Sequence, residues 1–267
     1  AILNISWDLL FVAVFHWGIA GAAYATIFAQ YVSGIGILLY VLFRCRSLFP
    51  ERKDLCFDGG ILKEIAGLSS LTCLQQSVMN FGILMVQGLV NSFGATTMAA
   101  FAAAVKIDTF AYLPVQDFGN AYSTFIAQNY GAGNKERIRR GTKESFAIST
   151  AFSLVISALV FAFAAPLMQI FVSSAETAGI ASRVRYLRIE GAFYFGIGCL
   201  FLLYGYYRAI KRAEMSVVLT VISLGIRVLL AYVLSATFLG ETGIWMAIPI
   251  GWILADLTGL LYMRKTW

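Results

Sequence analysis

Long apolar stretches alternate with short polar ones along the whole chain. A helix needs about 20 mostly apolar residues to cross the hydrocarbon core of a bilayer. Eight stretches fit this pattern, although the first is shorter than a full crossing. They lie at about residues 1–15, 18–43, 61–92, 95–130, 141–172, 184–207, 215–238 and 243–263. The pattern predicts an all-α protein, a bundle of membrane-crossing helices.

The predicted helix at 95–130 is longer than one straight crossing requires. At about 1.5 Å per residue it would extend well beyond a bilayer. Pro114 lies near its middle and removes a backbone donor, so we expect a kink there. We expect the last turns to extend into the cytoplasm before the polar segment 131–134.

Positive charge is concentrated in four short clusters, which recur after every second apolar stretch. They hold 14 of the 20 Lys and Arg residues: Arg44, Arg46, Arg52 and Lys53; Lys135, Arg137, Arg139, Arg140 and Lys143; Arg208, Lys211 and Arg212; Arg264 and Lys265. Cytoplasmic loops carry an excess of Lys and Arg, so both ends of the chain are predicted to be cytoplasmic. Three arginines near a predicted external end depart from the pattern, and we interpret them as residues whose long stems reach the membrane surface: Arg183, Arg185 and Arg188.

Composition supports a membrane protein and gives no sign of an enzyme. Hydrophobic residues make up 60% of the chain and charged residues 13%, against roughly 45–50% and about 25% in soluble domains. The net charge of +6 comes mainly from the loop clusters, which favours contact with membrane lipid over nucleic acid. The sequence contains no HExxH, GxSxG, P-loop or CxxC motif, so we expect neither an enzyme nor a bound cofactor.

A weak internal repeat indicates two lobes. Gly18-Ile-Ala-Gly-Ala recurs as Gly243-Ile-Trp-Met-Ala, 225 positions later, and both segments follow a short predicted external turn. Six crossings lie between the copies, so they share one orientation, as in parallel transporter repeats. We predict that residues 1–43 are the last two helices of one six-helix lobe, 44–60 a cytoplasmic linker, and 61–267 the second lobe. The chain would then be a fragment that lacks the first four helices.

Asn4 and Asp8 are candidates for a cation site in the first predicted helix. They are four residues apart and therefore share a helix face. A carboxylate and an amide oxygen suit Na⁺, or a proton held between acceptors, and we expect no other metal. Thr26 and Asp8 both lie nine residues from Trp17, so antiparallel helices would bring the Thr26 hydroxyl to the same depth. The alternative is that Asp8 only forms a hydrogen bond to a neighbouring helix.

Several ionisable residues lie within predicted crossings of the second lobe. Each costs roughly 2.5–3.5 kcal/mol on insertion and usually faces a cavity or a partner. Asp108 could neutralise a cationic substrate, and Lys106 could serve as its counter-charge when the cavity is empty. Glu190 and Arg227 are further candidates on later helices. The alternative is a set of buried structural ion pairs.

Polar side chains also follow one side of the third predicted helix. Gln76, Asn80 and Gln87 are spaced i, i+4, i+11, as expected for the wall of a substrate cavity, although hydrogen bonds between helices are equally compatible with this spacing. The 21 Phe and 13 Tyr residues supply faces for contact with organic cations.

Two motifs resemble the bacterial multidrug and toxic compound extrusion (MATE) transporters. One is Asn4-Ile-Ser-Trp-Asp8 with the later Gly18-Ile-Ala-Gly-Ala-Ala, and the other is Ala127-Gln-Asn-Tyr-Gly-Ala-Gly133 with the arginines that follow. The resemblance covers essentially the whole chain and implies twelve helices in two lobes around a cavity that opens alternately to each side. It also implies a first-lobe cation site, which Asn4, Asp8 and Thr26 match. Some members have a Glu on the seventh helix, where this chain has Gln75 and Gln76, so a Na⁺ site in the second lobe is not expected.

We therefore predict secondary active multidrug efflux, in which organic cations or amphipathic compounds leave in exchange for H⁺ or Na⁺. We expect a monomer in the plasma (inner) membrane that contributes to antibiotic resistance. The alternative is a flippase for lipid-linked sugars or lipids with a similar two-lobed cavity, which Lys106 and Arg227 leave open.

Overall fold

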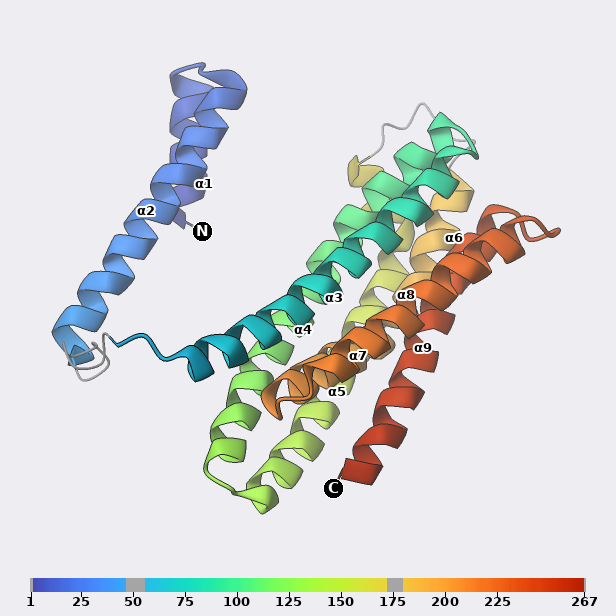
Figure 1. Cartoon of the computed structure of the whole chain (residues 1–267). Helices are drawn as coiled ribbons and strands as arrows, with labels where there is room; N and C mark the ends of the chain where they lie inside the picture. Colours follow the sequence, from blue (N-terminus) through green and yellow to red (C-terminus); the bar gives the residue numbers. More distant parts are fainter. Residues whose placement is uncertain (1, 47–55, 172–179, 267) are drawn as a thin grey trace. The chain divides into compact units, whose positions relative to one another are not determined.

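The computed structural model describes residues 2–46, 56–171 and 180–266, and within these ranges every regular element is a helix (Figure 1). The elements are α1 (Ile2–Asp8), the π-helix η1 (Leu9–Val14), α2 (Gly18–Arg44), α3 (Gly59–Asn91), α4 (Ala95–Gly131), α5 (Lys135–Phe171), α6 (Ile180–Gly191), α7 (Tyr194–Ala209), α8 (Ala213–Ser235) and α9 (Glu241–Thr266). They form an N-terminal unit, Ala1–Ile61, and a C-terminal unit, Leu62–Trp267. Three features named from the sequence lie outside the described residues: Arg52 and Lys53 of the predicted linker, and the Arg183 side chain.

Within the described residues, six helices are long and apolar enough to cross a membrane. They belong to α2, α3, α4, α5, α8 and α9. The bent pair α6 and α7 can form one further crossing, and Ile2–Val14 is a shorter apolar helical segment. The prediction of an all-helical, multi-pass membrane protein is therefore confirmed.

The first predicted helix changes its winding at Asp8. The α-helical turns of α1 end there, and the wider turns of η1 follow. Its aromatic side chains stack on one another in a ladder, with ring centroids 6.5 Å apart for Trp7 and Phe11 and 5.1 Å apart for Phe11 and Trp17. Phe28 of α2 packs edge-on against Trp7. These contacts join α1 and η1 to α2 within the N-terminal unit.

The predicted helix at 184–207 is two helices in the structure. The segments Val184–Gly191 and Tyr194–Ala209 meet at an angle of 49°. At the break two backbone hydrogen bonds span three residues and not the usual four. The Phe193 amide donates to the Glu190 carbonyl at 3.0 Å, and the Gly196 amide donates to the Phe193 carbonyl at 2.9 Å. The prediction of one continuous helix was therefore wrong.

The prolines inside α4 and α5 differ in how far they disturb the helix around them. Helix α4 continues through Pro114, whereas α5 contains a non-helical residue at Phe163, three residues before Pro166. Helix α5 also begins six residues earlier than predicted, at Lys135. The Asn134 side chain accepts a hydrogen bond from the Arg137 amide at 3.1 Å, which is the usual way to cap a helix start.

Helix α7 lies at the centre of the C-terminal unit, and most of its residues are buried. Glycines allow neighbouring helices to come close to it. A methyl group at Gly205 would lie 2.7 Å from the Gly119 carbonyl oxygen of α4, and one at Gly198 would lie 2.8 Å from the Ser153 hydroxyl of α5. Small residues at such contacts are typical of membrane helix pairs.

Candidate functional site

The residues predicted to bind a cation in the N-terminal unit are partly brought together. The Asn4 amide donates a hydrogen bond to the Thr26 hydroxyl at 3.4 Å, and Thr26 donates to the Ala22 carbonyl at 3.1 Å. Asp8 is half-buried and lies where α1 passes into η1. Irregular turns of this kind occur often at functional sites.

Asp108 of α4 is the centre of a polar cluster inside the C-terminal unit. Its side chain is only 3% exposed. The Tyr186 hydroxyl donates a hydrogen bond to Oδ2 at 2.7 Å, and the Tyr194 hydroxyl donates to Oδ1. Tyr186 belongs to α6 and Tyr194 begins α7, so the two oxygens of one carboxylate connect the two sides of the helix break.

Glu190 and Arg227 complete the cluster from α6 and α8. Glu190 is buried, and one of its carboxylate oxygens has no hydrogen-bond partner. Asp108 interacts electrostatically with both Glu190 and Arg227, and Glu190 interacts with Arg227. The Arg227 Nε is also buried without a partner. Two carboxyl groups and one guanidinium therefore share a buried site, with polar atoms left available for a small cation or for water.

Aromatic side chains pack beside the cluster. The Tyr186 ring meets Trp245 of α9 edge-on at 4.8 Å, and Trp245 stacks on Phe101 of α4 at 5.6 Å. Trp245 is 2% exposed. The aromatic side chains therefore help to shield the carboxyl groups from solvent, which strengthens electrostatic interactions between them.

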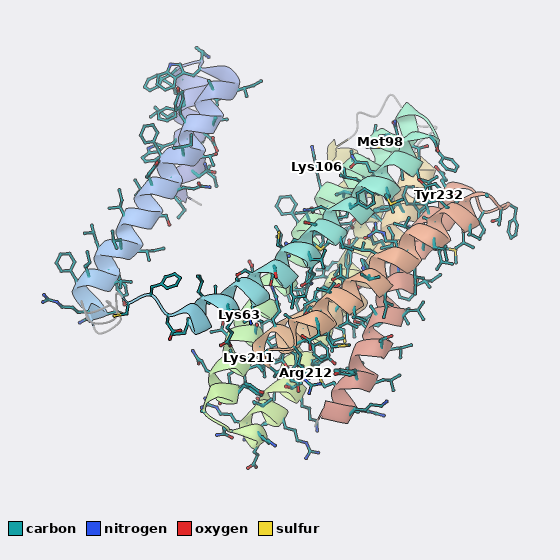
Figure 2. The ribbon with its side chains drawn as sticks, in the orientation of Figure 1. Lys63, Met98, Lys106, Lys211, Arg212 and Tyr232 are labelled. Atoms are coloured by element: carbon teal, nitrogen blue, oxygen red, sulfur yellow. The ribbon has the colours of Figure 1, made fainter. Side chains whose placement is uncertain are left out.

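Three residues predicted to line the substrate cavity do not join this cluster. Gln76 and Asn80 are exposed on α3, and Lys106 is exposed on α4 and extends away from the helices (Figure 2). The sequence left open that Lys106 serves as the counter-charge of Asp108 when the cavity is empty. In the structure the two side chains lie on different sides of α4, since residues two apart on a helix point in different directions. The positive group that interacts with Asp108 here is Arg227.

The two tyrosines were missed in the sequence, although a signal was present. Tyr186, Glu190 and Tyr194 are spaced i, i+4, i+8, the spacing of one helix face. A third buried acid, Asp256 of α9, has an oxygen without a hydrogen-bond partner, and its other oxygen lies 3.6 Å from the Cβ position of Gly196.

Comparisons with known proteins agree on the kind of protein. The sequence pattern of the MatE family matches residues 71–233. The chain is 30% identical over 266 residues to the probable multidrug resistance protein YpnP of Bacillus subtilis, covering 98% of this chain and 58% of that protein. It is 28% identical over 248 residues to the probable multidrug resistance protein NorM of Thermotoga maritima, covering 92% of this chain and 53% of that protein.

A solved structure supports the same conclusion. An outward-facing multidrug resistance MATE family transporter of the MOP superfamily superimposes with a TM-score of 0.91 at 25% identity, over 99% of this chain and 59% of that one. The chain thus spans somewhat more than half the length of these relatives. Their names are those of resistance and transport proteins and not of enzymes, as predicted. The chain belongs to the MatE family, the multidrug and toxic compound extrusion transporters.

Proposed function

We propose that the full-length protein exports organic cations or amphipathic compounds in exchange for H⁺ or Na⁺. The observation that carries this proposal is the buried Asp108 carboxylate, held by two tyrosines beside Glu190 and Arg227. Ionisable groups inside membrane helices are costly to insert, and they often mark ion or substrate pathways. The multidrug resistance names of the relatives support the choice of substrate class.

The cluster gives the coupling step a physical basis. A proton or Na⁺ that binds at Asp108 competes with the tyrosine hydroxyls for the same two oxygens. The hydrogen bonds that connect α6 to α7 then weaken, and the bend at residues 191–193 can change. A cation that binds one bend more tightly than the other shifts the population towards that state. Substrate binding that favours the opposite bend completes the exchange.

Asn4, Asp8 and Thr26 form a second cation site in this proposal, in the other lobe. The Asn4 amide nitrogen donates to the Thr26 hydroxyl oxygen, which brings the Asn4 amide group and the Thr26 hydroxyl side by side, and Asp8 supplies the charge. The protein acts as a monomer in the plasma (inner) membrane, with both ends of this chain in the cytoplasm, as the basic clusters indicate.

The test uses the full-length transporter in proteoliposomes, with an imposed proton or Na⁺ gradient and a fluorescent organic cation. Asp108→Asn keeps the size of the side chain but removes the charge, and we expect gradient-driven export to fall at least tenfold. Asp117→Asn is the matched control, because Asp117 is an exposed acid on the same helix. Asp8→Asn tests the second site in the same assay.

The outcomes separate the parts of the proposal. Export that is unchanged in both Asp108→Asn and Asp8→Asn would exclude carboxylate coupling. Wild-type protein that moves lipid-linked sugars but no organic cation would make it a flippase. Loss of export in Asp117→Asn as well would mean that the charge of α4 in general is needed, and not the cluster.

A further inference from the structure

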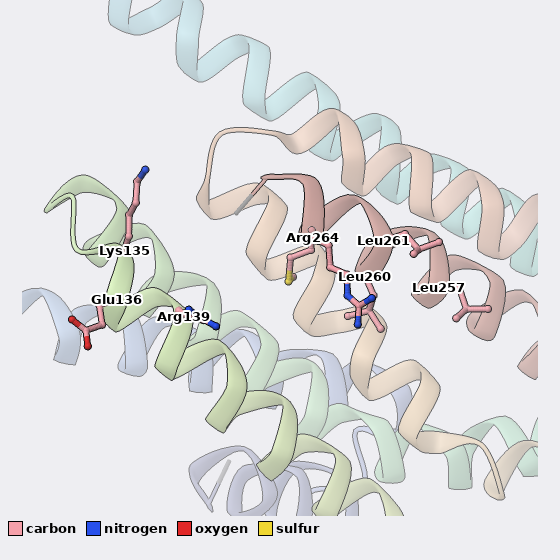
Figure 3. A pocket seen from close by; sticks show the side chains of 8 residues that line it. Lys135, Glu136, Arg139, Leu257, Leu260, Leu261 and Arg264 are labelled. Carbon is pink, nitrogen blue, oxygen red and sulfur yellow. The ribbon is translucent and has the colours of Figure 1, made fainter.

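A groove lies between the start of α5 and the end of α9, away from the Asp108 cluster. It has a volume of about 1010 Å³ and is lined by Lys135, Glu136, Arg139, Leu257, Leu260, Leu261, Met263 and Arg264 (Figure 3). Arg139 and Arg264 come from opposite walls (Figure 3). All the lining residues belong to the C-terminal unit.

The positive charges of the groove differ from two neighbouring arginines of α5, which have partners. Lys135, Arg139 and Arg264 are exposed and form no ion pair with a described residue. Two neighbouring arginines of α5 do have partners: Arg140 pairs with Glu144 at 2.8 Å, and Arg137 lies 5.6 Å from the centre of the Phe125 ring. Glu136 is the one acid in the lining, so the groove is positive overall.

The apolar wall of the groove continues deeper along α9. Leu257, Leu260 and Leu261 are 54%, 37% and 62% exposed, which is typical of side chains that face lipid in a membrane helix. Leu257 lies seven residues before Arg264, or about 10 Å along the helix at 1.5 Å per residue. The cations therefore lie at the ends of two membrane helices, where lipid headgroups begin, and the leucines lie at the depth of the acyl chains.

We propose that this groove binds an anionic phospholipid. The headgroup phosphate lies between Arg139 and Arg264, and an acyl chain lies along the leucines of α9. Guanidinium groups match phosphate oxygens in geometry and charge, and basic pockets between membrane helices are suited to anionic headgroups. The site is separate from the proposed export function, since its positive charge repels the organic cations expected as substrates.

The experiment measures lipid binding to the purified full-length transporter by native mass spectrometry, with phosphatidylglycerol as the probe. In the double variant Arg139→Gln/Arg264→Gln we expect binding to weaken about 30-fold, from roughly 1 kcal/mol for each cation near an anionic headgroup and a tenfold change per 1.4 kcal/mol. Arg140→Gln/Lys143→Gln is the matched control, because it also removes two positive charges, both from α5 and both outside the groove. It should bind as the wild type does.

Two further probes identify the occupant. Phosphatidylcholine has no net charge and should bind at least tenfold more weakly than phosphatidylglycerol to the wild type. Inorganic phosphate at millimolar concentration should not displace the lipid, since it has no acyl chain for the leucine wall. Equal binding of the two lipids, displacement by phosphate, or equal losses in the two double variants would each overturn the proposal. So would a wild-type protein that retains no phosphatidylglycerol because another part of the full-length chain fills the groove.

Discussion

Asp8 and Asp108 are both acids in membrane helices, and their surroundings differ sharply. Asp8 is half-buried in a unit where the only buried residues of α2 are Gly21 and Ala25. Asp108 is buried among α4, α6, α7 and α8, with both oxygens accepting hydrogen bonds. Within this chain, the acid that several helices surround has a defined hydrogen-bonding environment, and the acid packed beside a single further helix is less buried.

The two acids nevertheless share one structural property. Asp8 ends the α-helical turns of α1 before η1, and Asp108 bridges the break between α6 and α7. A helix that departs from regular winding leaves backbone groups free to adjust, and such places are often functional. In both units a carboxyl group is therefore located where a helix can change its shape.

Replacing each of the two acids with alanine should give the largest difference in stability between two variants. Asp108→Ala leaves two buried tyrosine hydroxyls without an acceptor, at about 1–3 kcal/mol each, so we expect a loss of about 2–6 kcal/mol in stability. Asp8→Ala should change it by less than about 0.5 kcal/mol, as is usual at less buried positions. The measurement is the thermal unfolding midpoint in detergent of this chain, residues 1–267, for which the burial of both acids is described. Equal shifts for the two variants would contradict the comparison.

Glycine-to-alanine substitutions test the same difference between the two units through helix packing. Gly205→Ala would place a methyl group 2.7 Å from a backbone oxygen of α4, so we expect a loss of about 1–3 kcal/mol. Gly34→Ala in α2 meets no atom within 4 Å and should stabilise the helix by up to about 1 kcal/mol. Gly225→Ala in α8 is the control, because it also meets no atom within 4 Å. If Gly225→Ala destabilised like Gly205→Ala, helix contact would not explain the difference.

The smallest expected effect concerns an exposed ion pair at the edge of the C-terminal unit. Lys211, between α7 and α8, donates a hydrogen bond to Glu64 of α3, and this contact raises the pKa of Lys211 above its usual value. The stabilisation is therefore complete below about pH 10.4, the ordinary lysine value, and is lost as the pH rises through the higher folded-state pKa.

This effect can be read from unfolding midpoints measured between about pH 9 and 12 for the wild type and Glu64→Gln. The two curves should converge at the alkaline end, and added salt should reduce their separation because the pair is exposed to solvent. A separation that grew with pH would mean that Glu64 acts through another contact.

Several features could be predicted from the sequence because they depend on local properties. Apolar length and the basic clusters identified the helices, and the spacing of Asn4 and Asp8 indicated a shared face. The bend at residues 191–193 could not be predicted, because no proline marks it and hydrogen bonds from Tyr186 and Tyr194 to another helix accompany it. The non-helical residue Phe163 could not be predicted from proline positions alone, because α4 continues through Pro114 whereas α5 departs from helical winding three residues before Pro166.

The amino-acid sequence alone established a polytopic all-α protein, its family resemblance and a set of unusual polar residues, since hydropathy and charge are properties of each segment by itself. It could not decide which of those polar residues meet. Lys106 and Asp108 are neighbours in the chain, yet Asp108 pairs with side chains 78 and 86 positions away, while Lys106 faces outward. That choice depends on how the helices of the C-terminal unit pack around α7, because packing determines which helix faces meet and which polar groups lose contact with water.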